Sequence, residues 1–208
     1  MAGGSKSRGQ GAGRQLKVRL KTAKQRTPSS QRWLERQLND PYVAAARAQG
    51  WRSRAAFKLM EIDDKHRLLK PGKRVVDLGA APGGWTQVAA ERVNSVEGKG
   101  QAVAIDILPM EAIAGSEILH LDFMDPTAPD RLKALLRDGG ADLVLSDMAA
   151  QGTGHTRTDH LRIIGLAEVA AQFACDVLSP GGAFLCKVFQ GGTERELLDL
   201  LKRSFTTV

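Results

Sequence analysis

Two hydrophobic patterns alternate along the chain from residue 74 onward. Short apolar runs rich in β-branched residues are separated by stretches whose apolar residues recur every three to four positions, as on one face of a helix. The short runs predict five strands, at 74–79, 101–106, 117–122, 141–147 and 183–189. The periodic stretches predict helices at 85–96, 127–138, 158–178 and 193–203, and a turn is expected at 179–182.

This alternation predicts an α/β fold. Strands joined by helices give right-handed crossovers and a mostly parallel sheet with helices on both faces, a Rossmann-like architecture. Residues 33–70 instead suggest two short helices, with a break at Asp40-Pro41. A chain of 208 residues suits one such domain. We therefore expect a domain over 33–208, with 33–70 as a helical lead-in and 71–208 as the sheet core.

Basic residues are concentrated near the N-terminus. Residues 1–34 contain nine Lys and Arg and no Asp or Glu, whereas the rest of the chain contains 21 basic and 23 acidic residues. Residues 1–32 are also poor in large apolar side chains, which predicts a disordered tail that binds nucleic acid through counterion release. A solubility tail is one alternative. A mitochondrial transit peptide is another, but the glycines argue against an amphipathic helix and favour a bacterial cytoplasm.

The composition disfavours several classes of protein. The sequence has no run of 18 apolar residues, so no membrane-spanning segment is expected. Cys175 and Cys186 cannot form a disulfide framework and stand in no CxxC pattern, which favours a reducing compartment. The four histidines have no metal-ligand spacing, so no metal is expected.

A glycine-rich segment follows the first predicted strand. Residues 77–85 read DLGAAPGGW, and the combination of strand end, loop and helix start lets a ligand approach the backbone closely. The spacing matches neither the GxGxxG of dinucleotide-binding folds nor the GxxxxGK[ST] of phosphate-binding loops. Both NAD and ATP are therefore weak candidates as ligands.

Acidic residues end the next two predicted strands. Asp106 can accept hydrogen bonds from a ribose diol, and Asp122 can meet an adenine amino group. In a parallel sheet these carboxylates share one edge with the glycine-rich segment, and ligands bind at that edge. Together they predict an adenosine site without a pyrophosphate-binding motif, which fits S-adenosylmethionine. Each feature alone is equally compatible with a tight turn or a helix N-cap.

Two lysines are candidates for chemistry. Lys187 lies within a predicted apolar strand, where a buried ammonium would be costly unless it faced a cleft and a partner. Lys58 lies beside the apolar stripe of a predicted helix, where a solvated lysine is the ordinary interpretation.

Residues 32–58 form a basic segment with interleaved aromatics. This pattern suits stacking and phosphate contacts with RNA, and it suits equally the packing of the aromatics onto the sheet. The basic residues are Arg32, Arg36, Arg47, Arg52, Arg54 and Lys58, and the interleaved Trp and Tyr residues are Trp33, Tyr42 and Trp51.

Six strings follow one another in a recognisable order. They are RSRAAFKL (52–59), VVDLGAAPGGWTQV (75–88), DILPM (106–110), LDFMD (121–125), LSDMAAQGTG (145–154) and KVFQGG (187–192). They resemble the FtsJ/RrmJ family of S-adenosylmethionine-dependent ribose 2′-O-methyltransferases. The resemblance implies S-adenosylmethionine as donor, no metal and, as substrate, a uridine of 23S ribosomal RNA in the 50S subunit.

The resemblance also implies residue roles. The family's catalytic Lys-Asp-Lys-Glu set falls on Lys58, Asp147 and Lys187 for its first three members. Lys187 would be the base, Lys58 would stabilise the oxyanion and position the ribose, and Asp147 would orient the pair. The family's cofactor contacts fall on Gly83, Trp85, Asp106, Asp122 and Asp147. The family's glutamate and the strands that complete its sheet are expected beyond Val208.

The preferred hypothesis is a monomeric RNA 2′-O-ribose methyltransferase. An NAD-dependent oxidoreductase is disfavoured by the spacing of the glycine-rich segment. The alternative from another class is a non-catalytic RNA-binding or ribosome-assembly factor that keeps a vestigial cofactor pocket.

Overall fold

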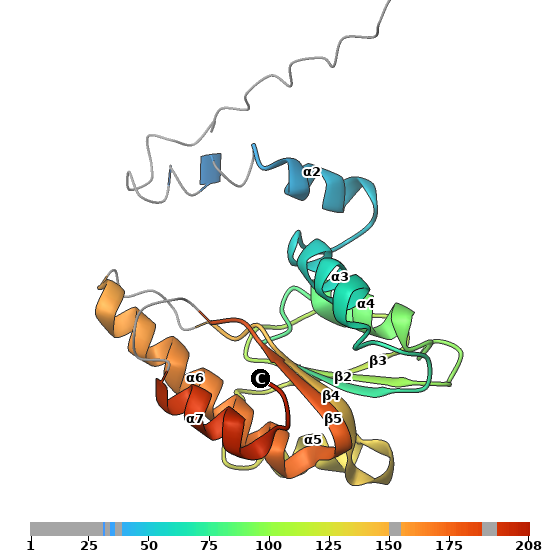
Figure 1. Cartoon of the computed structure of the whole chain (residues 1–208). Coiled ribbons are helices and arrows are strands. Elements are labelled where there is room, and N and C mark those ends of the chain that lie inside the picture. Colours follow the sequence, from blue (N-terminus) through green and yellow to red (C-terminus); the bar gives the residue numbers. More distant parts are fainter. Residues whose placement is uncertain (1–30, 32–33, 36–38, 150–154, 189–194) are drawn as a thin grey trace, which may run out of the picture. The chain divides into compact units, whose positions relative to one another are not determined.

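The computed structural model describes residues 31, 34–35, 39–149, 155–188 and 195–208 (Figure 1). The chain divides into two units, residues 1–45 and 46–208, and each is described by itself. Helix α2 (Pro41–Ala48) begins in the first unit and ends in the second. The predicted disordered tail, residues 1–32, lies outside the described residues apart from Gln31.

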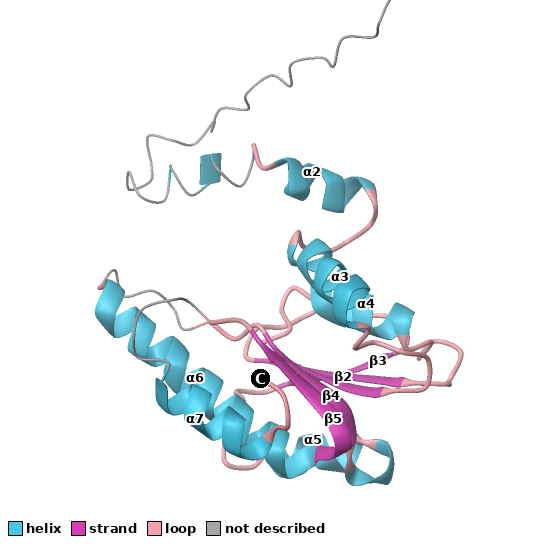
Figure 2. Cartoon of the chain, viewed as in Figure 1, coloured by secondary structure: helices cyan, strands magenta, loops and turns pink. Residues whose placement is uncertain are grey.

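The second unit is a parallel sheet with helices on both faces (Figure 2). The strands are β1 (Arg74–Leu78), β2 (Gln101–Asp106), β3 (Ser116–His120), β4 (Ala141–Ser146) and β5 (Leu178–Cys186). The helices are α3 (Ala55–His66), α4 (Gly84–Arg92), α5 (Ala128–Leu135), α6 (Thr156–Val177) and α7 (Arg195–Ser204), with a short 3-10 helix at Arg137–Gly139. The α/β fold predicted from the sequence is confirmed.

The order of the strands determines where a ligand can bind. The sheet runs β3-β2-β1-β4-β5, and all four pairings are parallel. Val76 of the central strand β1 pairs with Val103 of β2 on one side and with Val144 of β4 on the other. The direction of winding reverses between β1 and β4, and open α/β sheets bind ligands in the crevice at that position. The fold therefore places the candidate site after Leu78 and Ser146.

Aliphatic residues fill both faces of the sheet. Val76 and Val144 are fully buried in the cluster that α5 and α6 cover. Val75 and Leu143, on the opposite face, are buried in the cluster that α3 and α4 cover. Because successive residues of a strand point to opposite faces, burial on both sides gives the continuous apolar runs seen in the sequence. None of the helices in the described part of the chain has the length and apolar character needed to cross a membrane.

The fifth strand begins earlier than predicted. The predicted turn at 179–182 lies within β5, as an irregularity where the register with β4 shifts between Ala141 and Leu143. Gly181 has a φ of +80° in this irregularity, a conformation that glycine adopts readily. The turn residues thus interrupt the ladder without ending it, because Leu178 before them already pairs with β4.

Four strands end earlier than predicted, and the two largest differences, in β3 and β5, have a common reason. Strand β5 ends at Cys186 and not at 189, because its partner β4 ends at Ser146. Strand β3 ends at His120, opposite the last residue of β2. The prediction that Lys187 lies inside a strand is therefore wrong, since it is the first residue after β5.

Two helices are shorter than predicted. Helix α4 ends before the predicted limit of 96, and Asn94 has a left-handed φ of +57°. The predicted helix 127–138 is split at Leu136, whose extended backbone separates α5 from the 3-10 helix. Such single backbone conformations depend on tertiary packing, which hydrophobic periodicity does not report.

Candidate functional site

The segments after β1 and β4 touch at the switch point. Gly79, directly after β1, has a φ of +75°. A Cβ atom at this position would lie 2.8 Å from Cα of Met148, which belongs to the segment after β4. Only glycine combines this conformation with so close an approach. The backbone of the glycine-rich segment is therefore fixed against the loop that carries Asp147.

The start of α4 is equally crowded. Gly83 has a φ of +105° and directly precedes the helix, and a Cβ atom there would lie 2.6 Å from Cδ1 of Ile113. The first N–H groups of a helix have no intrahelical acceptor. Gly83, predicted to contact the cofactor, is thus a position that only glycine fits, because the side chains of Ile113 and Arg52 lie close to where a Cβ atom would be.

Asp106 joins two loops at the carboxyl edge. Its Oδ2 atom accepts a hydrogen bond from the N–H of Ala81 at 2.8 Å, and its Oδ1 atom accepts one from Leu108 at 2.7 Å. Each carboxylate oxygen has a second lone pair, so Asp106 can still accept hydrogen bonds from a diol. Asp122, exposed after β3, accepts a hydrogen bond from the N–H of Met124 at 2.9 Å.

Apolar side chains lie exposed beside these two acids. Ile107 and Leu108 follow Asp106, Met124 lies two residues after Asp122, and more than half of each apolar side chain is accessible to solvent. Exposed apolar groups beside hydrogen-bond acceptors are typical of a surface that receives a flat, partly polar ligand. This combination suits an adenine ring.

Asp147 and Lys187 form an ion pair at the ends of neighbouring strands. Asp147 follows β4, and its N–H donates to the carbonyl of Leu78 at 3.2 Å. Lys187 follows β5, and its N–H donates to the carbonyl of Ser146 at 2.9 Å. The Lys187 ammonium contacts Oδ1 of Asp147, and the two side chains are 44% and 23% exposed. The structure thus brings together two of the three predicted catalytic residues.

Lys58 has a different partner. It lies on α3, and its ammonium pairs with Oε2 of Glu61, one turn further along, at 3.2 Å. Its side chain is 64% exposed. Among the described contacts, none joins Lys58 to Asp147. An exposed pair of this kind is worth about 0–1 kcal/mol, so its separation would cost little.

The Trp85 side chain has a structural role. The indole is buried in the cluster that joins α3 and α4, and its Nε1 atom donates a hydrogen bond to the carbonyl of Ala55 at 2.9 Å. Any cofactor contact from this predicted residue would therefore come from its backbone.

Asp77 is a site residue that the sequence analysis did not select. It lies on β1, 2% exposed, and its Oδ2 atom accepts a hydrogen bond from the Thr86 hydroxyl at 2.6 Å. Its Oδ1 atom is buried without a hydrogen-bond partner among the described residues. Burial raises the pKa of Asp77 to about 7 despite the Thr86 hydrogen bond, and the charges of Asp147 and Asp106 add to the rise. The sequence feature that could have pointed to Asp77 is the presence of an acid within the apolar run VVDLG.

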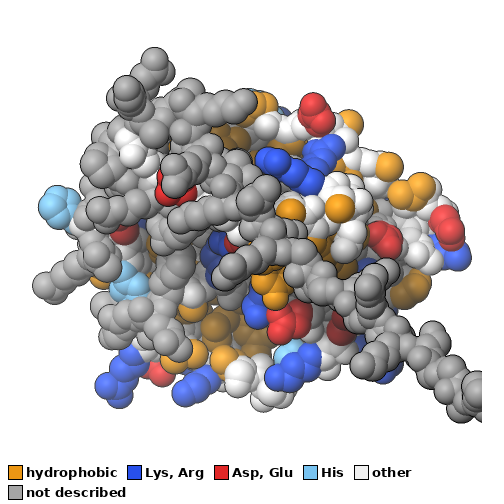
Figure 3. Space-filling model, turned by 90° about the horizontal axis from the view of Figure 1, so that it is seen from above, with side chains coloured by type: hydrophobic (Ala, Val, Ile, Leu, Met, Phe, Trp, Pro, Cys, Tyr) orange, Lys and Arg blue, Asp and Glu red, His pale blue; other side chains and the backbone are white. Residues whose placement is uncertain are grey.

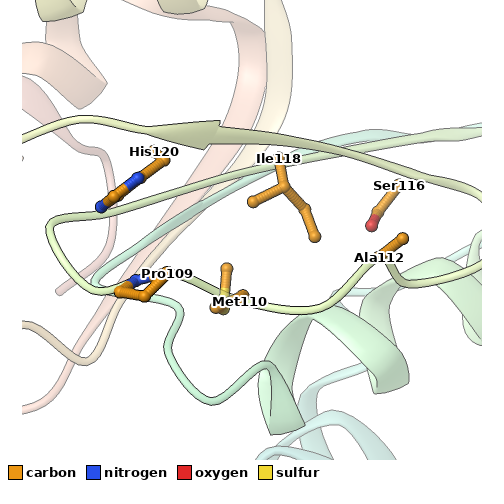
Figure 4. A pocket seen from close by; sticks show the side chains of 6 residues that line it. All are labelled: Pro109, Met110, Ala112, Ser116, Ile118 and His120. Atoms are coloured by element: carbon orange, nitrogen blue, oxygen red, sulfur yellow. The ribbon is translucent and has the colours of Figure 1, made fainter.

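A pocket of about 370 Å³ lies beside β3 (Figure 4). It is formed by one face of β3 and by the β2–β3 connection. The Nε2 atom of His120 at its edge lies 2.9 Å from the carbonyl oxygen of Ile107. The lining residues, which include none of the predicted cofactor contacts, are Pro109, Met110, Ala112, Ser116, Ile118 and His120.

The predicted RNA-binding segment is only partly described. Arg32, Trp33 and Arg36 lie outside the described residues. Trp51 packs against the cluster that joins α3 and α4, as the packing interpretation expected, whereas the Tyr42 side chain is largely exposed. Among the described side chains visible in Figure 3, positive and negative charges are interspersed. Within the described residues no group of three or more His, Cys, Asp or Glu could hold a metal.

Comparison with known proteins gives one consistent family. The model of the FtsJ-like methyltransferases matches residues 51–208. A relative from Azorhizobium caulinodans is 63% identical over 195 residues, which cover 94% of this chain and 81% of that protein. A relative from Bradyrhizobium diazoefficiens is 66% identical over 193 residues, which cover 93% of this chain and 84% of that protein. Both relatives are named ribosomal RNA large subunit methyltransferase E.

A solved structure shows the same fold. The crystal structure of a Plasmodium falciparum protein, provisionally assigned as a ribosomal RNA methyltransferase, superimposes with a TM-score of 0.69 at 31% identity. The match covers 76% of this chain and 89% of that one.

Proposed function

Because the chain belongs to the FtsJ-like methyltransferase family, we propose that it transfers the methyl group of S-adenosylmethionine to a ribose 2′-hydroxyl of large-subunit ribosomal RNA. The names of the relatives support large-subunit RNA as the substrate, and their bacterial source, together with a ribosomal substrate, supports the bacterial cytoplasm as the place of action. The resemblance of the motifs supports a uridine of 23S RNA, presented in the 50S subunit to a monomeric enzyme.

The residues at the switch point fit S-adenosylmethionine. Asp106 would hold the ribose diol, and Asp122 would face the adenine amino group between Ile107 and Met124. The backbone at Gly83, which carries no side chain of its own at the start of α4, would lie beside the amino-acid portion. The cofactor supplies a sulfonium-activated methyl group, and the carboxylates of Asp106 and Asp147, at the carboxyl ends of β2 and β4, suit its positive charges.

The observation that carries the catalytic proposal is the Asp147–Lys187 pair. Bound S-adenosylmethionine would supply its methyl group to the ribose oxygen, and the electron pair of the broken carbon–sulfur bond would stay on sulfur. Lys187 would act as general base: its ammonium, paired with Asp147 here, would first release a proton to solvent, and Nζ would then accept the hydroxyl proton. Asp147 holds Nζ in place and stabilises the ammonium that results.

Lys58 would complete the site from α3. Its ion pair with Glu61 is exposed and weak, so an approaching ribose oxyanion or phosphate could recruit its ammonium. Its role would then be to stabilise the developing negative charge and to position the ribose.

The test is methylation of undermethylated 50S subunits by the full protein and its Lys187→Ala variant. We expect the rate to fall by about a hundredfold or more while S-adenosylmethionine binding is retained, because only the proton acceptor is lost. Lys99→Ala is the matched control, since Lys99 is also exposed and paired with an acid, Glu97. Unchanged methylation by Lys187→Ala would exclude this mechanism.

Binding measurements separate the remaining alternatives. Calorimetry should detect S-adenosylmethionine binding and no comparable binding of NAD. If the wild-type protein bound 50S subunits without methylating them, the non-catalytic assembly factor would be the better interpretation.

A further inference from the structure

Arg52 joins three segments around the proposed cofactor site. Its guanidinium donates two hydrogen bonds, one to the carbonyl of Glu111 and one to the carbonyl of Ala112, both at 2.7 Å. Its backbone N–H donates to Oε1 of Gln87 on α4 at 2.8 Å. We propose that Arg52 is a positioning residue for cofactor binding, which fixes the β2–β3 connection against the start of α4 and the segment leading into α3. This inference rests on the proposed function, because it assumes that S-adenosylmethionine binds at this edge.

The β2–β3 connection needs such support. Residues 107–115 join two parallel strands without a helix, so no helical hydrogen bonds hold the connection in shape. The connection begins directly after Asp106 and carries the exposed side chains of Ile107 and Leu108. A shift of this segment would therefore displace both the ribose acceptor and the surface proposed for the adenine.

The guanidinium reaches this connection beside the glycine-rich segment. At Gly83, a Cβ atom would lie 2.6 Å from Cδ1 of Ile113 and 3.3 Å from Cδ of Arg52. The β2–β3 connection, the start of α4 and the Arg52 side chain thus meet at one glycine that is itself a predicted cofactor contact. A shift of the Arg52 side chain would therefore also shift the loops proposed to hold the cofactor.

The other side of Arg52 is anchored to α4. The Gln87 side chain, which accepts from the Arg52 N–H, also donates from Nε2 to the carbonyl of Gly50 at 3.2 Å. Trp85 donates to the carbonyl of Ala55, the first residue of α3. The segment that leads into α3 is therefore held to α4 at several points, and Arg52 extends this framework to the β2–β3 connection. The same framework carries Lys58.

The geometry favours this role over an RNA contact. Each terminal nitrogen of Arg52 donates one hydrogen bond to a backbone carbonyl, so the planar fork is turned toward the β2–β3 connection, whereas a phosphate-binding arginine presents this fork outward. A lysine could not replace it, because a single ammonium lacks the planar fork that reaches two successive carbonyls.

Two substitutions test the proposal: Arg52→Met removes the hydrogen bonds, and Arg52→Lys keeps the charge. We expect both to raise the dissociation constant of S-adenosylmethionine about tenfold or more in calorimetry, with little rescue by lysine. In steady-state methylation, the KM for S-adenosylmethionine should rise more than kcat falls. The affinity for 23S RNA and its dependence on salt should stay unchanged.

Arg47→Met is the matched control, because Arg47 is an exposed arginine of the same basic segment, and we expect it to leave S-adenosylmethionine affinity unchanged.

A second measurement keeps the inference separate from the proposed function. In the ligand-free protein, amide hydrogen exchange of residues 107–113 should be faster in Arg52→Met than in the wild type, while the strands keep their protection. Wild-type cofactor affinity in both variants, or unchanged exchange over 107–113, would overturn the role of Arg52. Failure of the wild-type protein to bind S-adenosylmethionine would instead overturn the proposed function, and the exchange experiment would still report whether Arg52 fixes the connection.

Discussion

Asp77 shows what a single residue contributes at the carboxyl edge. It lies on the central strand, buried, with Thr86 as its hydrogen-bond partner and Asp106 and Asp147 as its charged neighbours. The sequence shows an acid within an apolar run. It does not show that the Thr86 hydroxyl donates a hydrogen bond to this acid, because that contact depends on how α4 packs onto the sheet. Asp147 and Lys187, in contrast, could be placed at one edge from the sequence, because each lies at the carboxyl end of a strand predicted to belong to a parallel sheet.

The raised pKa of Asp77 predicts a pH-dependent stability. The folded-state value of about 7 lies above the ordinary 3.8, so the native state holds the proton more tightly than the unfolded state. Its contribution is therefore fully present below about pH 4 and is lost as pH rises towards 7. Asp77→Asn, which is uncharged at every pH, should gain ~1–4 kcal/mol relative to the wild type between pH 4 and pH 8.

Urea unfolding of both ligand-free proteins at pH 5 and pH 8 measures this difference. Asp138→Asn is the control, because the Asp138 side chain is almost fully exposed and should show no such trend. A difference between wild type and Asp77→Asn that is the same at both pH values would contradict a buried, titrating Asp77.

At the scale of elements, the strands and helices were predictable in kind but not in their ends. Burial on both faces produces the apolar runs of β1 and β4, and these were recognised. The ends of β3 and β5 follow the ends of their partner strands, which no local pattern contains. The close approach of the loops after β1 and β4 is likewise invisible in sequence, although the glycine that permits it was part of the selected motif.

Two glycine substitutions separate backbone strain from this close approach. Gly79 and Gly98 have nearly the same φ, +75° and +74°, but only Gly79 has Met148 where a Cβ atom would lie. We expect Gly98→Ala to cost ~1 kcal/mol of stability and to leave cofactor binding unchanged. Gly79→Ala should cost more and weaken S-adenosylmethionine binding, because the loop that carries Asp147 must move. Equal effects of the two changes on stability and binding would refute the contact at the switch point.

At the scale of the whole molecule, the excess of basic residues and the proposed catalytic and cofactor-binding residues lie in different parts of the sequence. Residues 1–34 carry the basic excess, whereas the rest of the chain, which contains the sheet, has slightly more acidic than basic residues. A parallel α/β class was predictable from the alternation of elements. The strand order β3-β2-β1-β4-β5, which puts the crevice between β1 and β4, was not, because order is decided by long-range packing.

This separation predicts that RNA affinity and cofactor affinity can be changed independently. Deletion of residues 1–32 should weaken binding to 23S RNA and flatten its dependence on salt, because fewer counterions are released. S-adenosylmethionine binding should be unaffected. Filter binding at several salt concentrations, with calorimetry of the cofactor, checks both statements, and a salt dependence equal to that of the whole chain would argue against a role of the tail.

The central claim concerns where the cofactor lies, and a crystal structure with bound S-adenosylhomocysteine tests it most directly. We predict the ribose at Asp106, the adenine between the segments after β2 and β3, and the sulfur facing the Asp147–Lys187 pair. A nucleoside bound in the pocket beside β3, or a sulfur turned away from the Lys187 ammonium, would contradict the account.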